Sequence, residues 1–168
     1  MSNQNTRRKK HKLTPESQFR CTLDQCSKSK ELSAAITLYE SSSNPTLTLN
    51  NLNSLLYICS EALSNSNTRQ SADFGFKLFH NHSNENLKPN EATLTAVARL
   101  AAANGDGDYA FDLAKSVTKQ CAAPKLRTFT PALNCFCGAG AADRAYEVEE
   151  HVVSEGPQME RALPAVNS

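Results

Sequence analysis

The chain has 168 residues, of which 39% are hydrophobic and 7% aromatic, and it contains no tryptophan. This length suits one domain with a core of small aliphatic side chains and is short for two. No apolar run approaches the roughly 20 residues that cross a bilayer, and the basic N-terminus lacks the apolar segment of a signal peptide. We therefore expect an intracellular protein with no membrane association.

The formal net charge of +1 conceals a segregation along the chain. The first twelve residues hold five basic side chains and no acid, namely Arg7, Arg8, Lys9, Lys10 and Lys12. Residues 13–168 then carry 13 basic against 17 acidic side chains. We expect residues 1–14 to form a disordered basic tail. Such a run is typical of a nuclear-import signal or a nucleic-acid-binding arm, the alternative being a solvated tail without function, and it favours a nuclear location.

The six cysteines give no sign of a disulfide framework or a zinc site. Without a secretory signal, reduced thiols are expected. Structural zinc sites usually use two close pairs of ligands, and the chain has no CxxC. We expect these thiols to behave as small apolar side chains: Cys21, Cys26, Cys59, Cys121, Cys135 and Cys137.

From about Glu16 the chain repeats one pattern of apolar residues. The pattern places them at i, i+3, i+4 and i+7, which is one face of a helix. It begins at Phe19, Leu52, Leu94 and Phe129, and the last two starts are 35 residues apart. The copy at Phe19 is the weakest. The sequence predicts the first helix of a repeat at each of these places.

A second apolar pattern follows each first helix and starts at Ala35, Gly75, Ala110 and Ala145. The two patterns start 16 residues apart in three copies and 23 apart in the second, whose extra residues lie in the polar stretch SNSNTRQSAD. An isolated helix pair cannot bury its apolar stripe, so we expect stacked pairs in an all-α solenoid. The expected repeats are residues 16–48, 49–90, 91–125 and 126–156, followed by a divergent tail at 157–168.

Glycine and aspartate mark the expected turns within the third and fourth repeats. Glycine can take the left-handed conformations that end a helix, and aspartate can cap the start of the next one. The expected turn glycines are Gly105, Gly107, Gly138 and Gly140, and the expected capping residues are Asp108 and Asp143.

The fourth repeat, RTFTPALNCFCGAGAADRAYEVEEHV, resembles a pentatricopeptide repeat. The phrases LDQCSKSKELSAAITLYE, NSLLYICSEAL and KPNEATLTAVARLAAANGDGDYAFDLAK are similar to the repeat region of plant protein-only RNase P of the nuclear type. The resemblance runs from Leu13 to Val153 and includes the extra loop of the second repeat. It implies a right-handed solenoid of about four helix-turn-helix repeats.

The resemblance also implies a function. Members of that family cleave the 5′ leader from precursor tRNA; their repeats bind the tRNA elbow, a central region holds zinc, and a nuclease domain binds magnesium. Only the repeats match here, so we expect no catalytic residue, metal or other cofactor in this chain. The first hypothesis is a module that binds precursor tRNA without cleaving it. The alternatives are a helical scaffold for a protein partner without RNA affinity, and an incomplete fragment of a full ribonuclease P.

In pentatricopeptide repeats, the resemblance implies that two positions per repeat face the RNA bases. The position after the aromatic residue or Leu of the first helix is Arg20, Asn53, Thr95 and Thr130. The last position before the next repeat is Thr48, Asn90 and Lys125. Asn53 with Asn90 is similar to a pyrimidine-reading pair, whereas Thr95 with Lys125 follows no familiar pairing. The alternative is that these are ordinary polar residues on a solvated face. Phosphate contacts need cations on one face, and the candidates are Arg20, Lys88, Arg99, Lys125 and Arg127.

Two further sequence features are poor candidates for functional sites. The stretch from Asn104 to Asp108 is similar to a calcium loop, but that loop needs Gly and Glu where this chain has Tyr109 and Lys115. A helix stop followed by a helix start is expected instead. His151 lies near Glu147 and Glu150 and is expected at the surface. No residue is a candidate for catalysis.

Overall fold

The computed structural model describes residues 14–42, 45–64, 68–83, 87–120 and 126–155. The expected tails at 1–14, apart from Thr14, and 157–168 lie outside the described residues, as do Cys121 and Lys125. None of the described helices is long and apolar enough to cross a membrane.

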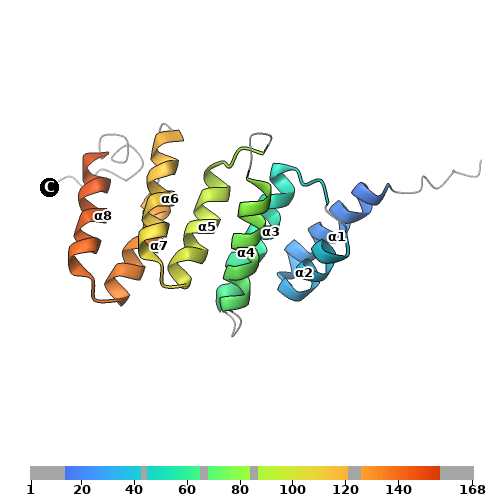
Figure 1. Ribbon diagram of the computed structural model, residues 1–168, viewed down its shortest axis with the longest axis horizontal. Coiled ribbons are helices and arrows are strands. Elements are labelled where there is room, and N and C mark those ends of the chain that lie inside the picture. Colours follow the sequence, from blue (N-terminus) through green and yellow to red (C-terminus); the bar gives the residue numbers. More distant parts are fainter. Residues whose placement is uncertain (1–13, 43–44, 65–67, 84–86, 121–125, 156–168) are drawn as a thin grey trace, which may run out of the picture.

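The described residues form eight α-helices and one short 3-10 helix, which Figure 1 shows side by side in a row that follows chain order. The predicted all-α repeat fold is confirmed. The bounds are α1 (Pro15–Ser29), α2 (Leu32–Ser41), α3 (Leu49–Glu61), η1 (Ala62–Ser64), α4 (Thr68–His82), α5 (Glu91–Ala103), α6 (Gly107–Gln120), α7 (Leu126–Gly138) and α8 (Ala142–Ser154).

The helices pack in two layers. Each odd-numbered helix contacts the next odd-numbered one, and each even-numbered helix contacts its neighbours along the chain. We call α1, α3, α5 and α7 the odd-helix layer. The core between the layers holds large side chains from α3, such as Leu52 and Leu56, and alanines on facing helices, such as Ala98, Ala110 and Ala132. Small alanine side chains let the helix backbones approach closely, so each pair buries its stripe against the next.

The second repeat differs from the expected division. Helix α4 begins at Thr68, seven residues before the apolar pattern at Gly75, whereas α6 begins three residues before Ala110. Part of the polar stretch expected as a loop is therefore the first turn of a helix. Ser71 and Ala72 are fully buried, so this segment packs against the core.

The turns within repeats also differ in detail from the expected ones. Gly105 and Gly140 take the left-handed conformation, with φ of 81° and 70°. Gly107 lies inside the first turn of α6 and not in the connecting turn. Asp106, in place of Asp108, caps this helix, since its Oδ1 accepts the backbone N–H of Tyr109 at 3.0 Å. Asp143 lies in the first turn of α8, as expected, but it does not cap the helix, because the N-cap residue is Ala141, which has no side-chain hydrogen bond.

Candidate nucleic-acid interface

The predicted RNA-facing positions meet where one repeat joins the next. Each meeting point also includes the third residue of the following odd-numbered helix, and we call the three residues a junction. The first junction is Arg20, Thr48 and Asn51, and the second is Asn53, Asn90 and Thr93. Of the third, the structure describes Thr95 and Thr128.

The second junction is a closed hydrogen-bond network. Asn90 caps α5, and its Oδ1 accepts the Thr93 backbone N–H at 3.1 Å. The Asn53 Nδ2 group of α3 donates to the same oxygen at 3.1 Å. The Thr93 hydroxyl accepts the Asn90 backbone N–H at 3.2 Å and lies 2.6 Å from Asn53 Oδ1. The structure thus brings together the predicted pair Asn53 and Asn90 by a direct hydrogen bond, and adds Thr93, which the sequence did not single out.

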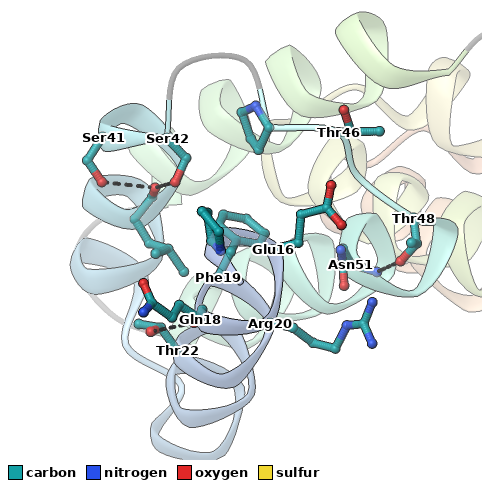
Figure 2. A pocket seen from close by; sticks show the side chains of 13 residues that line it. Glu16, Gln18, Phe19, Arg20, Thr22, Ser41, Ser42, Thr46, Thr48 and Asn51 are labelled. Atoms are coloured by element: carbon teal, nitrogen blue, oxygen red, sulfur yellow. Dashed lines mark hydrogen bonds between the residues drawn. The ribbon is translucent and has the colours of Figure 1, made fainter. Parts of the chain in front are cut away.

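The first junction is open and lies beside a hollow of about 640 Å³. Thr48 caps α3 and accepts the Asn51 backbone N–H at 3.2 Å. Arg20 is exposed on α1, and Figure 2 shows its side chain extending on the side of the hollow where Thr48 and Asn51 lie. An arginine beside a helix N-terminus forms a positive surface that can meet an anionic group.

The third junction has polar atoms without partners. The hydroxyl oxygens of Thr95 and Thr128 are buried and have no hydrogen-bond partner within the described residues. Lys125, which was predicted to face the RNA with Thr95, lies outside the described residues. The last predicted contact, Thr130, is exposed, and its hydroxyl donates to the backbone oxygen of Leu126 at 3.1 Å.

Two arginines of the odd-helix layer border a second hollow, of about 520 Å³, between α5 and α7. Arg99 and Arg127 line it together with Thr130 and Asn134. Arg99 Nη1 lies 4.0 Å from Glu61 Oε1, and Arg127 Nη2 lies 3.3 Å from Glu91 Oε1. These exposed ion pairs are weak, so both guanidinium groups remain able to meet a phosphate.

No group of three or more His, Cys, Asp or Glu within the described residues could hold a metal ion. In the stretch that is similar to a calcium loop, Asp106 caps α6 and Asp108 forms an ion pair with Arg144. His151 is half-buried and not fully exposed as expected. Its Nε2 is buried without a partner among the described residues, and its ring centre lies 5.7 Å from that of Phe111 and 5.4 Å from that of Phe129.

The described cysteines are all free. Burial raises the pKa of the Cys59 thiol to about 12, and burial is also the largest cause that raises the pKa of Cys26. Cys21 and Cys137 are exposed. The buried thiols act as apolar core side chains, because a thiolate at either place would be poorly solvated.

The sequence contained a signal for the missed third position. Thr93 and Thr128 stand 35 residues apart, at the same place in successive repeats. The spacing of Asn90 and Thr93 is that of a capping box, in which two side chains satisfy backbone N–H groups reciprocally. Aligning the repeats on their helix starts would have brought these threonines into view.

Comparison with known proteins gives consistent matches along the chain. Residues 6–163 match the family described as the pentacotripeptide-repeat region of PRORP. Proteinaceous RNase P 3 of Arabidopsis thaliana is 43% identical over 93% of this chain and 28% of its own length. Proteinaceous RNase P 2 of the same plant is 41% identical over 96% of this chain and 32% of its own length. The chain therefore spans about a third of the curated relatives that it matches.

Solved structures agree in fold. The crystal structure of nuclear proteinaceous RNase P 2 from A. thaliana matches with a TM-score of 0.77 and 43% identity, over 85% of this chain and 31% of that one. The repeat domain of A. thaliana protein-only RNase P 1, in complex with tRNA, matches with a TM-score of 0.73 and 39% identity. That match covers 84% of this chain and 72% of the other.

Proposed function

This chain belongs to the protein-only RNase P family through its pentacotripeptide-repeat region, and from that premise we propose that it is a module that binds precursor tRNA. One observation carries the proposal: a repeat domain 39% identical to this chain, with the same fold, is described in complex with tRNA. The proposal concerns RNA binding and assigns cleavage to no residue of this chain.

The odd-helix layer supplies the groups that such binding needs. Side-chain amides and hydroxyls at the junctions suit the edges of unpaired bases, which is how proteins read loops in folded RNA. Arg20, Arg99 and Arg127 supply positive charge beside them. The side chains of Arg99 and Arg127 are 46% and 66% exposed, so a phosphate can replace their weak carboxylate partners.

The distribution of acidic residues also favours the odd-helix layer as the RNA-binding face. Helix α8 is rich in exposed carboxylates, from Asp143, Glu147, Glu149 and Glu150. RNA carries a dense negative charge, and like charges repel, so this even-numbered helix is a poor surface for it. The odd-helix layer carries as many cations as carboxylates, so it repels RNA less than α8 does.

We also place the protein in the nucleus. The relative of known structure that is 43% identical is described as nuclear. The basic run from Arg7 to Lys12 has the composition of an import signal. A fusion of residues 1–14 to a fluorescent reporter tests this part of the proposal, since a reporter that stays evenly spread through the cell contradicts it.

The direct test is a titration with a precursor tRNA transcript and an unrelated RNA hairpin, at about 50 mM and about 200 mM salt. We expect tighter binding to the tRNA and an affinity that falls steeply with salt, because phosphate contacts release counterions. Equal and negligible binding to both RNAs would remove the tRNA function and favour a protein-binding scaffold.

A further inference from the structure

The dipeptide Thr-Pro occurs twice in the chain, at Thr14-Pro15 and at Thr130-Pro131. Proline lacks a backbone N–H and favours an extended conformation in the residue before it. One class of protein kinases, the proline-directed kinases, recognises this dipeptide in an extended segment of its substrate. The two copies have the same local chemistry, so the fold decides whether a kinase can reach the hydroxyl of each threonine.

Thr14 presents its hydroxyl on the surface in the required backbone conformation. It is the exposed N-cap residue of α1, with φ of −61° and ψ of 154°, which is extended. Its hydroxyl accepts the Ser17 backbone N–H at 3.2 Å and donates to Ser17 Oγ at 3.0 Å. Both hydrogen bonds are exposed, and water replaces them at little net cost when a second protein engages the hydroxyl.

The helix that follows Thr14 can open locally. The first buried residue of α1 is Leu23, and within residues 15–22 only Ser17 and Phe19 are half-buried. Opening the first turn therefore exposes little apolar area, and it requires much less free energy than unfolding of the whole array. The residues on both sides of Thr14 can thus enter the groove of a kinase in an extended form.

The second copy of the dipeptide is held inside the fold. Thr130 is exposed on α7, where its hydroxyl donates to the Leu126 backbone oxygen at 3.1 Å. Its neighbours Phe129 and Ala132, however, are only 1% and 0% exposed. An extended backbone at Thr130 would pull both side chains out of the core, so the fourth repeat would have to unfold first. Thr130 is therefore an internal control with the same dipeptide and a closed backbone.

A phosphate on Thr14 would act on the basic run that precedes it. Residues 1–14 hold five basic side chains and no acid, and a phosphothreonine adds a charge of about −1.5 to −2 at pH 7. Lys12 stands two residues before Thr14, so the two Cα atoms are at most about 7 Å apart. This distance is within the Debye length of about 8 Å at physiological salt, so the charges are not screened from each other. The positive end of the α1 dipole also favours the phosphate, so the modified chain keeps its fold.

We propose that Thr14 is a phosphorylation site for a proline-directed protein kinase, and that its phosphate weakens the attraction of the basic run from Arg7 to Lys12 to RNA. The effect on RNA rests on the proposed function, whereas the site itself does not. In the transfer, Thr14 Oγ1 attacks the γ-phosphorus of ATP and gives its proton to a base of the kinase. The new P–O bond forms as the bond to the β,γ-bridging oxygen breaks, and ADP leaves.

The first measurement is phosphorylation of the full chain by a proline-directed kinase with Mg-ATP, followed by mass spectrometry of its peptides. We expect the wild type and Thr130→Ala to take up phosphate at Thr14, and Thr14→Ala and Pro15→Ala to lose it. The rates at Thr14 and Thr130 are each divided by the rate for a short peptide of the same sequence, which removes the sequence preference of the kinase. Equal normalised rates at the two threonines, or no phosphate on Thr14, would overturn the inference.

The second measurement compares precursor tRNA binding by the phosphorylated and unphosphorylated chains, at about 50 mM and about 200 mM salt. We expect phosphorylation to weaken binding about tenfold at the lower salt and to reduce the salt slope by about 2, because the phosphate offsets that many positive charges. Kinase-treated Thr14→Ala should bind as the untreated chain does. The effect of the phosphate should also disappear when five basic residues are changed to Gln, namely Arg7, Arg8, Lys9, Lys10 and Lys12.

The site and the proposed function can fail separately. A wild type that binds precursor tRNA no better than an unrelated hairpin ends the proposed function and the effect on RNA, while the mapped phosphate still decides the site. A chain that binds tRNA and takes up no phosphate at Thr14 ends the inference alone. Equal affinity and equal salt slope before and after phosphorylation contradict the action of the phosphate on the basic run.

Discussion

Gly107, in the first turn of α6, lies directly against the aromatic ring of Phe136 on α7: a Cβ at residue 107 would stand 2.6 Å from Cε1 of that ring. The contact sets how closely the third repeat approaches the fourth. Phe136 is buried in the shared core, so its ring has little room to move aside.

We expect Gly107→Ala to lower the free energy of unfolding by about 1–3 kcal/mol, because the added methyl group overpacks the contact with Phe136. The matched change is Gly138→Ala on α7, where a Cβ would meet nothing within 4 Å. Urea denaturation of the two variants gives the comparison. Equal stabilities would show that the backbone of α6 shifts freely away from α7.

The turn between the helices of a repeat uses a left-handed residue at one equivalent place. It is Gly105 in the third repeat, Gly140 in the fourth and Lys30 in the first, with φ of 81°, 70° and 55°. We expect Gly105→Ala to cost about 1 kcal/mol, since an L-residue is strained there. Lys30→Gly should instead raise the midpoint of thermal unfolding. A fall in that midpoint would mean that the ion pair of Lys30 with Glu61 outweighs the backbone strain.

Arg99 provides a test of the RNA-facing surface. We expect Arg99→Gln to weaken precursor tRNA binding about threefold to tenfold and to reduce the salt slope by about 1, because one phosphate contact is lost. Arg69→Gln is the control, since Arg69 is exposed on α4, beside the hollow between α2 and α4. Filter binding at several salt concentrations measures both. Equal losses in the two variants would indicate nonspecific attraction to the whole protein.

His82 should make stability depend on pH. Burial lowers the pKa of His82 from its ordinary value, and Nε2 lies 2.8 Å from the Tyr39 hydroxyl. As pH falls below about 6.5, the unfolded chain takes up the proton before the folded one does, so the unfolding free energy falls. The loss is complete below the lowered pKa of the folded state.

Denaturation midpoints between pH 5 and pH 7.5 would record this dependence. His82→Gln should flatten the profile across the window below pH 6.5. His80→Gln changes an exposed histidine of the same helix and should keep the wild-type shape. An identical slope in wild type and His82→Gln would assign the pH dependence to other groups.

Cysteine reactivity should follow exposure. Because burial raises the pKa of Cys59 to about 12, almost none of this thiol is ionised at pH 8, and only the thiolate is alkylated rapidly. We expect iodoacetamide to modify the exposed Cys21 and Cys137 more than about 100-fold faster than Cys59. Mass spectrometry of peptides over a time course measures the rates, and the denatured chain should show similar rates at all three.

Sequence periodicity predicted most of the packing, because the burial of a helix face follows its apolar spacing. Leu94, Val97, Ala98 and Ala101, expected on one face, are all buried. The first turn of α4 was not predictable in this way, since Ser71 and Ala72 carry no apolar pattern and are buried by their neighbours. The periodicity also places the first residue of each helix less well than its centre, as Gly107 shows.

In the candidate site, too, local features were predictable from the sequence, whereas contacts between distant helices were not. The resemblance to pentatricopeptide repeats paired Asn53 with Asn90, and the spacing of Asn90 and Thr93 is that of a capping box, which the structure contains. The third bond, from Thr93 to Asn53, spans 40 residues of sequence and depends on how α3 and α5 approach. A one-dimensional pattern carries no information about that distance. Whether the junctions contact RNA stays a prediction.

Contacts between successive odd-numbered helices also affect how the chain folds during its synthesis. The contacts that join helices run between elements that are close in sequence, so the array has a low contact order and little loop-closure entropy to overcome. Once α3 has left the ribosome, α1 and α2 can pack against it. Each later helix pair then packs against the pair that has already folded. Folding should therefore advance from the N-terminus during synthesis, and pulling-force measurements on nascent chains stopped after α3, α5 and α7 would show three successive steps.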